Sequence, residues 1–321
     1  MQIFHNLDDL PADYGATVVS VGNFDGLHRG HQFLLSKVIT RAKQLHARSL
    51  AITFDPHPTR LLKPEACPPL ITPSLQERLA LLGTTQIDAT LVLPFTAAFS
   101  QQSASEFVHV LLRRVRAVEV HEGSNFRFGY RAQAGVDELS TLGRRLGFGV
   151  HVYGALQLRG MAVSSSQIRK LVAEGDVRRA RWLLGRPFSM LSTPARGRGI
   201  GGRLTVPTIN LADYEGLTPA SGVYVTRMQV EDACFDAVTN VGTRPTFGEP
   251  SFAIESHLLN FSPVDLTPHT PLRLTFLARL REERQWPSPE ALREQIGRDV
   301  AHARRYLARL PAPDAAHPVR P

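Results

Sequence analysis

The chain reads TVVSVGNFDGLHRGH from Thr17 to His31, and this stretch decides the fold of the first half. The apolar run Thr17–Val21 is typical of a buried parallel strand, and His31–Val38 has the apolar spacing of a helix that covers it. Between them, Gly22 and Gly26 allow the backbone to turn tightly and to approach a ligand. The N–H groups and the dipole of such a helix start favour an anion, so the stretch predicts a phosphate site.

Two histidines, His28 and His31, follow at a spacing of three residues, so both rings leave one face of the helix start. Rings in that position can donate hydrogen bonds to phosphate oxygens as charge builds up, which implies nucleotidyl transfer. Taken alone, the pair is more typical of ordinary surface residues, or of half a metal site. No Cys-rich or His-Glu-x-x-His pattern supplies a third metal ligand nearby, and the flanking Gly22, Gly26 and Gly30 favour phosphate binding.

Length and composition indicate a two-domain protein of the cytoplasm. The chain of 321 residues is long enough for two cores, and its two cysteines, Cys67 and Cys234, indicate no disulfide framework. We find neither a leader pattern nor an apolar run that approaches a membrane span, so we expect a soluble protein that is not exported. The net charge of +8 favours anionic ligands, and nucleotides explain it as well as nucleic acid would.

Apolar strand-like runs alternate with helix-like periodicity over the first half, which predicts a doubly wound parallel sheet. The strand-like runs are 49–54, 87–93, 117–120 and 148–153, and the helix-like segments are 75–82, 104–115 and 137–146. Ligands bind beyond the carboxyl ends of the strands in such sheets. The unusual residues gather at three of these ends, in Gly22–Gly26, Asp55–Pro58 and Gly123–Gly129, and predict one site.

Three polar segments of the first half each allow two interpretations. His57 stands between two prolines that stiffen its loop, although the tetrapeptide alone is as typical of a solvated turn. Asn125 follows Gly123 and suits either a simple turn or the close approach of a ligand. Serines open the segment Ser164–Arg169, which suits either a plain helix cap or a helix start that holds a triphosphate.

The sequence pattern changes after Gly185 and Pro187, which end a helix-like segment and mark a domain boundary. Short runs of β propensity, separated by Gly, Pro, Asn and Asp, then predict a small antiparallel barrel. These runs are 222–230, 234–241, 252–261 and 272–280. The pattern over 289–310 predicts an amphipathic helix that we expect to cover one side of the barrel, and the Pro- and Ala-rich end is expected to be disordered.

Two features of the second half indicate binding or catalytic residues. Residues 196–203 are glycine-rich and basic, as in a loop over phosphates, although a disordered linker explains the composition equally well. Glu255 stands in an otherwise apolar strand, where an unpaired carboxylate is costly. It therefore needs a partner or a catalytic role.

With these motifs assembled, the chain resembles the bacterial bifunctional riboflavin kinase/FMN adenylyltransferases, also called FAD synthetases. The order and spacing of four motifs match, at 22–31, 54–58, 123–129 and 164–169. The resemblance implies an α/β FMN adenylyltransferase domain over 1–185 with a nucleotidylyltransferase-like sheet. It also implies a β-barrel riboflavin kinase domain over 186–310, followed by a tail at 311–321.

The implied activities are phosphorylation of riboflavin to FMN and adenylylation of FMN to FAD, with ATP as co-substrate and Mg²⁺ as cofactor. His28 and His31 would stabilise the phosphates of ATP while the FMN phosphate attacks the α-phosphorus. Ser164, Ser165 and Arg169 would hold the departing pyrophosphate. The other implied nucleotide-binding residues of this half are Gly22, Phe24, Asp25, Gly26, His57 and Asn125.

In the second half, the resemblance implies that Glu255 is the general base that takes the proton from the ribityl hydroxyl of riboflavin. Thr208 and Asn210 would position Mg²⁺ and the ATP phosphates, with Gly197 and Gly199 in the nucleotide loop. The implied flavin-binding residues are Asn240, Gly242, Arg244, Pro245 and Thr246.

The kinase loop departs from the usual family pattern, GRxLGFPTAN, because this chain has GGRLTVPTIN from Gly201 to Asn210. Gly202 replaces the usual arginine, and the β-branched Thr205 replaces a glycine. Arg198 replaces a usual aspartate. Because the implied base and magnesium residues are retained, we expect kinase activity with altered nucleotide affinity or rate.

Three alternatives stay open. In the first, the kinase half is impaired and the chain makes only FAD from FMN. In the second, the chain is a related nucleotidylyltransferase that acts on another phosphate acceptor. In the third, the basic glycine-rich loops bind nucleic acid backbones, which salt-sensitive binding without ATP consumption would reveal. We expect small-molecule substrates, riboflavin, FMN and ATP, and neither nucleic acid nor a membrane as partner.

Overall fold

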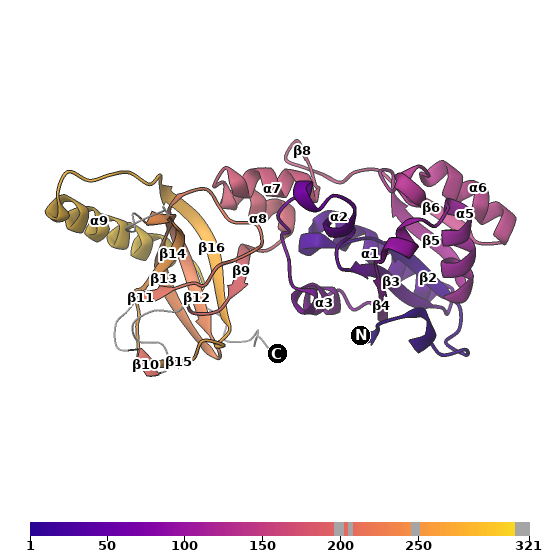
Figure 1. Cartoon of the computed structure of the whole chain (residues 1–321), viewed down its shortest axis with the longest axis horizontal. Helices are drawn as coiled ribbons and strands as arrows, with labels where there is room; N and C mark the ends of the chain where they lie inside the picture. The colour runs from indigo at the N-terminus through magenta and orange to yellow at the C-terminus, as the bar shows by residue number, and fades with distance from the viewer. Residues whose placement is uncertain (196–201, 205–207, 245–250, 312–321) are drawn as a thin grey trace. The chain divides into compact units, whose positions relative to one another are not determined.

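The computed structural model describes residues 1–195, 202–204, 208–244 and 251–311 (Figure 1). Contacts within the chain divide it into two compact units, Met1–Ser165 and Ser166–Pro321. The domain boundary expected after residue 185 falls inside the second unit and stays a prediction about the extent of the domains.

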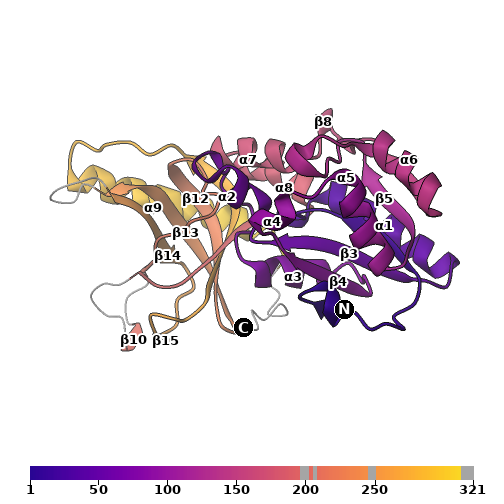
Figure 2. The ribbon, with the colours of Figure 1, turned by 45° about the vertical axis from the view of Figure 1, so that its right-hand side comes forward.

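The first unit contains a six-stranded sheet in which every neighbouring pair of strands is parallel (Figures 1 and 2). Its order is β1-β4-β3-β2-β5-β6. The strands are β1 (Gln2–Phe4), β2 (Thr17–Val21), β3 (Arg48–Asp55), β4 (Ala89–Pro94), β5 (Ala117–Gly123) and β6 (Gly149–Tyr153). All five residues of β2 are buried, as expected of a central strand that is covered on both faces.

Helices cover both faces of this sheet. The helices and turns are α1 (Arg29–Gln44), α2 (Pro58–Leu62), α3 (Leu75–Gly83), α4 (Ala97–Ser100), α5 (Ala104–Glu106) and α6 (Val136–Leu146), with η1 (Leu7–Asp9), η2 (Asp25–Leu27), η3 (Pro64–Ala66), η4 (Phe107–Leu112) and η5 (Tyr130–Ala132). One face of the sheet packs on apolar residues of α1 and α3, and the opposite face packs on η4 and α6. The doubly wound parallel sheet is therefore confirmed.

Two elements of the first unit differ from the sequence predictions. The helix expected over 104–115 is a short α5 followed by η4, which is a π-helical segment. Phe107 and Leu112 are both buried at a spacing of five, which suits the wider π turn. Strand β1 was not expected, because it is three residues long and two of them are exposed, so it shows no apolar pattern.

The second unit contains a six-stranded antiparallel sheet in the order β11-β14-β13-β12-β16-β9. The strands of this unit are β9 (Phe188–Ser192), β10 (Gly202–Leu204), β11 (Thr208–Asn210), β12 (Gly222–Val230), β13 (Ala233–Arg244), β14 (Ser251–Leu258), β15 (Val264–Leu266) and β16 (Leu272–Arg281). Strands β10 and β15 form a separate two-stranded ladder, and in the first unit β7 (Gln157–Leu158) pairs with β8 (Met161–Ala162).

The sheet of the second unit is buried on one face by aromatic side chains and covered on the other by a helix. The ring of Phe276 contacts those of Phe188 and Tyr224 in the core. The helix α9 (Pro289–Leu307) lies along the other face (Figure 2). There, Ala303 and Leu307 pack with Val225 of β12 and Leu277 of β16. The helices α7 (Ser165–Ala173) and α8 (Val177–Leu184) precede β9.

This arrangement confirms an antiparallel half-barrel with a terminal helix. The expected disordered tail at 311–321 lies, apart from Pro311, outside the described residues. Within the part of the chain that the structure describes, we find no helix that combines the length and the apolar character needed to cross a lipid bilayer.

Candidate active sites

The loop after β2 has a backbone conformation that only some residues tolerate. The N–H of Gly22 donates to the carbonyl of Ile52 at 2.9 Å, which holds the loop beside β3. Phe24 then adopts the left-handed conformation, with φ of 49°, and Gly26 has φ of 77°. A Cβ on Gly26 would lie 2.9 Å from Cγ2 of Ile71, so glycine is required there for space as well as for conformation.

Asp25 is buried and anchors this loop to a second segment of the chain. Its carboxylate accepts the backbone N–H of Ile71 at 3.1 Å and that of Thr72 at 2.8 Å. Its backbone carbonyl accepts the hydroxyl of Ser165 at 3.1 Å, so the fourth sequence motif meets the first. The carboxylate of Asp25, predicted to bind nucleotide, thus has a structural role in this arrangement.

His28 caps the first turn of α1 with its ring. Its Nδ1 accepts the backbone N–H of His31 at 3.3 Å, so in the neutral ring the proton lies on Nε2, which becomes the donor. A Cβ on Gly30 would lie 3.1 Å from the ring of His28 and 3.4 Å from the carbonyl of Val163, so Gly30 leaves room for both. The spacing of glycine and histidine that was noted in the sequence therefore serves the placement of this ring.

His57 repeats the same arrangement at the start of α2. Its Nδ1 accepts the backbone N–H of Thr59 at 3.3 Å and lies 2.7 Å from the hydroxyl of Thr59. The neutral ring therefore also carries its proton on Nε2. Both His28 and His57 are buried, at 6 % exposure each, and both are fixed in one tautomer by a helix start.

His31 stacks on His28, with ring centroids 3.6 Å apart and planes 14° apart, and Phe24 contacts it edge to face at 5.3 Å. Burial, with the neighbouring His28 as the second cause, lowers the pKa of His31 well below its ordinary value. Among the described residues, its Nδ1 is a buried atom without a hydrogen-bond partner. An anion bound beside the ring would favour the protonated form that this environment disfavours.

The lowered pKa of His31 predicts an acid-sensitive first unit. Between about pH 6.5 and the lower folded pKa, the unfolded chain binds a proton that the folded protein does not, so the free energy of unfolding falls as pH falls. His31→Phe keeps an aromatic ring in the stack and removes the titration. Chemical denaturation at several pH values should give the wild-type protein a slope up to about 1.4 kcal/mol per pH unit steeper than that of the variant. Equal slopes would contradict this origin of the acid sensitivity.

Arg78 of α3 was missed by the sequence analysis, although it holds two loops of this site. Its guanidinium donates to the backbone carbonyl of Asn23 at 3.3 Å and to that of Phe54 at 2.9 Å, and it lies 3.5 Å from the carboxylate of Asp55. Burial lowers the pKa of Arg78, which is only 4 % exposed. The one sequence signal was its place on the apolar stripe of the helix, three residues after Leu75.

The remaining predicted residues of the first site lie at the expected strand and helix ends. Asn125 is exposed and follows β5, and a Cβ on Gly123 would lie 2.9 Å from its Oδ1, so the glycine lets this side chain turn back. Ser164 is half-buried immediately before α7. Arg169 follows Ser165 by four residues on α7 and belongs by its contacts to the second unit.

Three strands of the second unit align the predicted kinase residues. In the antiparallel register, Asn210 of β11 lies opposite Glu255 of β14, and Asn240 of β13 lies opposite Glu255 on the other side. Paired residues of antiparallel strands point to the same face, so the three side chains form a row across the sheet. Thr208 shares that face, two residues before Asn210. The sequence placed these residues in separate motifs, and the sheet brings them together.

The flavin-binding residues expected on β13 are described only in part. Gly242 lies two residues after Asn240, and a Cβ there would overlap the carboxylate of Glu283. Arg244 is the last residue of β13. The other predicted positions, Gly197, Gly199, Pro245 and Thr246, and the unusual Arg198 and Thr205, lie outside the described residues.

Two family models match this chain in succession. The FAD synthetase model matches residues 10–167, and the riboflavin kinase model matches residues 184–307. The first match contains all the predicted residues of the first site except Arg169, and the second contains those of the kinase site.

Curated relatives match over nearly the whole length. A bifunctional riboflavin kinase/FMN adenylyltransferase of Pseudomonas fluorescens is 34% identical over 310 residues, which cover 96% of this chain and 98% of the relative. The enzyme of the same description from Escherichia coli K12 is 28% identical over 305 residues, with 94% and 96% covered. A crystal structure described as a macrolide-efflux protein from Streptococcus pneumoniae matches with a TM-score of 0.81 at 24% identity over 94% of this chain and 98% of that one, which shows a shared fold.

Proposed function

The chain belongs to the bifunctional riboflavin kinase/FMN adenylyltransferase family, and we propose that the two sites described above carry its two reactions. The first part has FMN adenylyltransferase activity and the second has riboflavin kinase activity. The proposal concerns the residues that act, the metal and the small-molecule substrates riboflavin, FMN and ATP. We also propose that the enzyme works in the cytoplasm.

In the first site, His28 and His57 stabilise the phosphates of ATP through Nε2–H. The observation that supports this role is that each Nδ1 accepts a helix-start N–H, so each ring presents the opposite nitrogen as a donor. The FMN phosphate attacks the α-phosphorus in line, and pyrophosphate leaves towards Ser164, Ser165 and Arg169. No covalent enzyme intermediate is formed, because catalysis depends on positioning and on stabilisation of charge.

His31 contributes to the same site in its protonated form. Its ring is neutral at neutral pH when no anion is bound, because burial lowers its pKa. The triphosphate supplies the negative charge that raises this pKa again, and the stacked His28 holds the ring in place.

In the second site, Glu255 accepts the proton of the ribityl hydroxyl as that oxygen attacks the γ-phosphorus of ATP, and ADP leaves as the bond from the γ-phosphorus to the bridging oxygen breaks. The observation that supports this role is the row of Asn210, Glu255 and Asn240 across three strands. Asn210 and Asn240 flank Glu255 on the two neighbouring strands, so a polar side chain lies on each side of the proposed base. Asn240, Gly242 and Arg244 lie along β13, where we place the flavin.

The side chains of Thr208, Asn210 and Glu255 offer only oxygen ligands or amide groups, which suits the hard cation Mg²⁺. Thr208 and Asn210 lie on one face of β11, so both can contribute to one ion. When bound, Mg²⁺ neutralises charge on the phosphate oxygens of ATP. Gly202 and Thr205 replace usual residues of the neighbouring loop, and we propose that they alter the affinity for ATP or the rate of phosphorylation.

A chromatographic time course tests the proposed pair of reactions. The full chain is incubated with Mg²⁺, ATP and riboflavin, or with Mg²⁺, ATP and FMN, and both flavin products are quantified. Riboflavin should give FMN first and FAD later, and FMN should give FAD directly. FAD from FMN alone would show that the kinase is inactive, as expected if the unusual loop impairs it. The absence of a flavin product from either substrate would favour another phosphate acceptor.

A further inference from the structure

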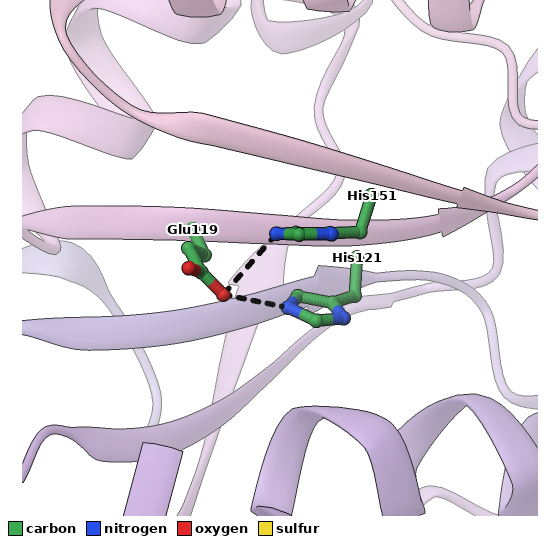
Figure 3. Close-up of side chains that lie close together, drawn as sticks. All are labelled: Glu119, His121 and His151. Carbon is green, nitrogen blue, oxygen red and sulfur yellow. Dashed lines mark hydrogen bonds and ion pairs between the residues drawn. The ribbon is translucent and has the colours of Figure 1, made fainter. Parts of the chain in front are cut away.

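A cluster of two histidines and one glutamate lies in the first unit among residues to which the two reactions give no role. Glu119 and His121 belong to β5, and His151 belongs to the neighbouring β6 (Figure 3). His121 lies directly opposite His151 in the parallel register, and Glu119 lies two residues before His121 on the same face. This is the face that α1 covers, since Arg41 of α1 contacts Glu119.

One carboxylate oxygen and two imidazole nitrogens of these side chains lie close together. Oε2 of Glu119 lies 3.2 Å from Nε2 of His121 and 3.3 Å from Nε2 of His151, as the dashed lines of Figure 3 show. Each of the three side chains offers one ligand atom, and these atoms lie within 4.8 Å of one another. Zinc ligands lie about 2.0–2.1 Å from the ion in a tetrahedron, whose edges are then about 3.3 Å long. The two distances from the carboxylate therefore match the edges of a zinc tetrahedron.

Groups around the cluster hold the ligands in orientation. Nδ1 of His121 lies 2.9 Å from the hydroxyl of Tyr153, and a hydrogen bond on this nitrogen leaves Nε2 for a metal. The rings of His121 and His151 are stacked, with centroids 4.5 Å apart and planes 24° apart. Nη2 of Arg41 donates to Oε1 of Glu119 at 2.7 Å, which fixes the carboxylate through the oxygen that faces away from the histidines.

The three proposed ligands differ in exposure. The side chains of His121 and Glu119 are 3% and 11% exposed, while that of His151 is 44% exposed. The cluster therefore meets solvent at His151.

We propose that Glu119, His121 and His151 form a site for a divalent transition-metal ion of the zinc class, with two nitrogen ligands, one oxygen ligand and an open fourth position. Within the described residues, this is the group of three metal-ligating side chains that the structure brings together. The ion replaces the two imidazole N–H···O contacts and ties the edge strand β6 to β5. Its role is to stabilise the first unit, and it is distinct from the Mg²⁺ that the two reactions use.

Arg41 also opposes the ion, because its positive charge lies on the same carboxylate. Its Nε also reaches Oε2, at 2.8 Å, so it competes with the metal for the ligand oxygen. Removing this charge should therefore strengthen metal binding. An ordinary ion-pair network makes no such prediction, since loss of Arg41 would merely weaken it.

The test uses the full chain, freed of metal with a chelator and dialysed, and titrated with Zn²⁺ by calorimetry and with Co²⁺ by visible absorption. The expected result is one tight site per chain, a Co²⁺ spectrum of tetrahedral type and a raised thermal midpoint with Zn²⁺. His151→Ala should weaken Zn²⁺ binding at least about tenfold. Because His151 is half exposed, this change should leave the fold and both flavin reactions in Mg²⁺ unchanged.

Two further variants complete the design. The matched control His302→Ala removes an exposed histidine of α9 and should leave Zn²⁺ binding as it is. Arg41→Gln should raise the affinity for Zn²⁺ several-fold. The proposal is overturned if Zn²⁺ binds no tighter to the wild-type protein than to His151→Ala, or if Co²⁺ gives only the spectrum of the hydrated ion. Neither result depends on whether the flavin reactions are assigned correctly.

Discussion

His28→Asn should lower the rate of FAD formation from FMN and ATP by about 10²–10³-fold, while riboflavin is still converted to FMN at the wild-type rate. Asparagine is a good helix N-cap, so its side chain can accept the N–H of His31 as Nδ1 of His28 does at 3.3 Å. The variant thus keeps the start of α1 and removes the Nε2–H donor. The measurement is the same chromatographic assay, with initial rates of FAD formation from FMN.

This variant distinguishes the loss of a catalytic hydrogen-bond donor from a loss of folded structure. Kinase activity in the same molecule reports on the second unit, and the thermal midpoint reports on the first. His5→Asn, at an exposed position of the first unit, serves as the matched control and should leave both rates unchanged. FAD synthesis at the wild-type rate by His28→Asn would show that this ring does not stabilise the reacting phosphates.

Glu255→Gln should have the reverse effect, lowering the rate of FMN formation from riboflavin by about 10²–10⁴-fold and leaving FAD formation from added FMN intact. Glutamine has the same length and keeps a side-chain oxygen between Asn210 and Asn240, but it cannot accept the proton of the ribityl hydroxyl. The measurement follows FMN and FAD from riboflavin, with FMN as the second starting material.

A comparison of kcat and KM identifies the role of this carboxylate. A general base contributes in the transition state, so kcat should fall while the KM for riboflavin changes little. Glu231→Gln, at an exposed glutamate in the turn that joins β12 and β13, is the matched control. An unchanged kcat in Glu255→Gln would assign the proton transfer to another group.

Much of the fold follows from local patterns. The alternation of buried runs with helical periodicity predicted β2 to β6 and the helices between them, because each of these signals lies within one element. The exposed β1 was missed because its pairing with β4 involves residues 87 positions away, as in Gln2 with Ala89, and no local feature shows it. The π-helical η4 was taken for an ordinary helix because both place apolar residues on one side.

The candidate sites show the same limit. His28 was predicted because glycines and histidine stand together in the sequence, whereas Arg78 acts on the carbonyls of Asn23 and Phe54, which are distant in the chain. The metal-ligand cluster of the first unit matches no short sequence pattern of the Cys-rich or His-Glu-x-x-His kind. His121 and His151 are 30 residues apart, and only the pairing of β5 with β6 brings them opposite each other.

The row of Asn210, Glu255 and Asn240 also restricts how the gene for such a protein can change in length. Along β14, half-buried Glu255 and His257 alternate with buried Ile254, Ser256 and Leu258. Inserting or deleting one codon before Glu255 within this strand would exchange the two faces, so the carboxylate would enter the core. Ile254 would replace it in the row after an insertion, and Ser256 would replace it after a deletion. Point substitutions can therefore change the activity of this site gradually, whereas insertions and deletions are tolerated only in the connections between strands.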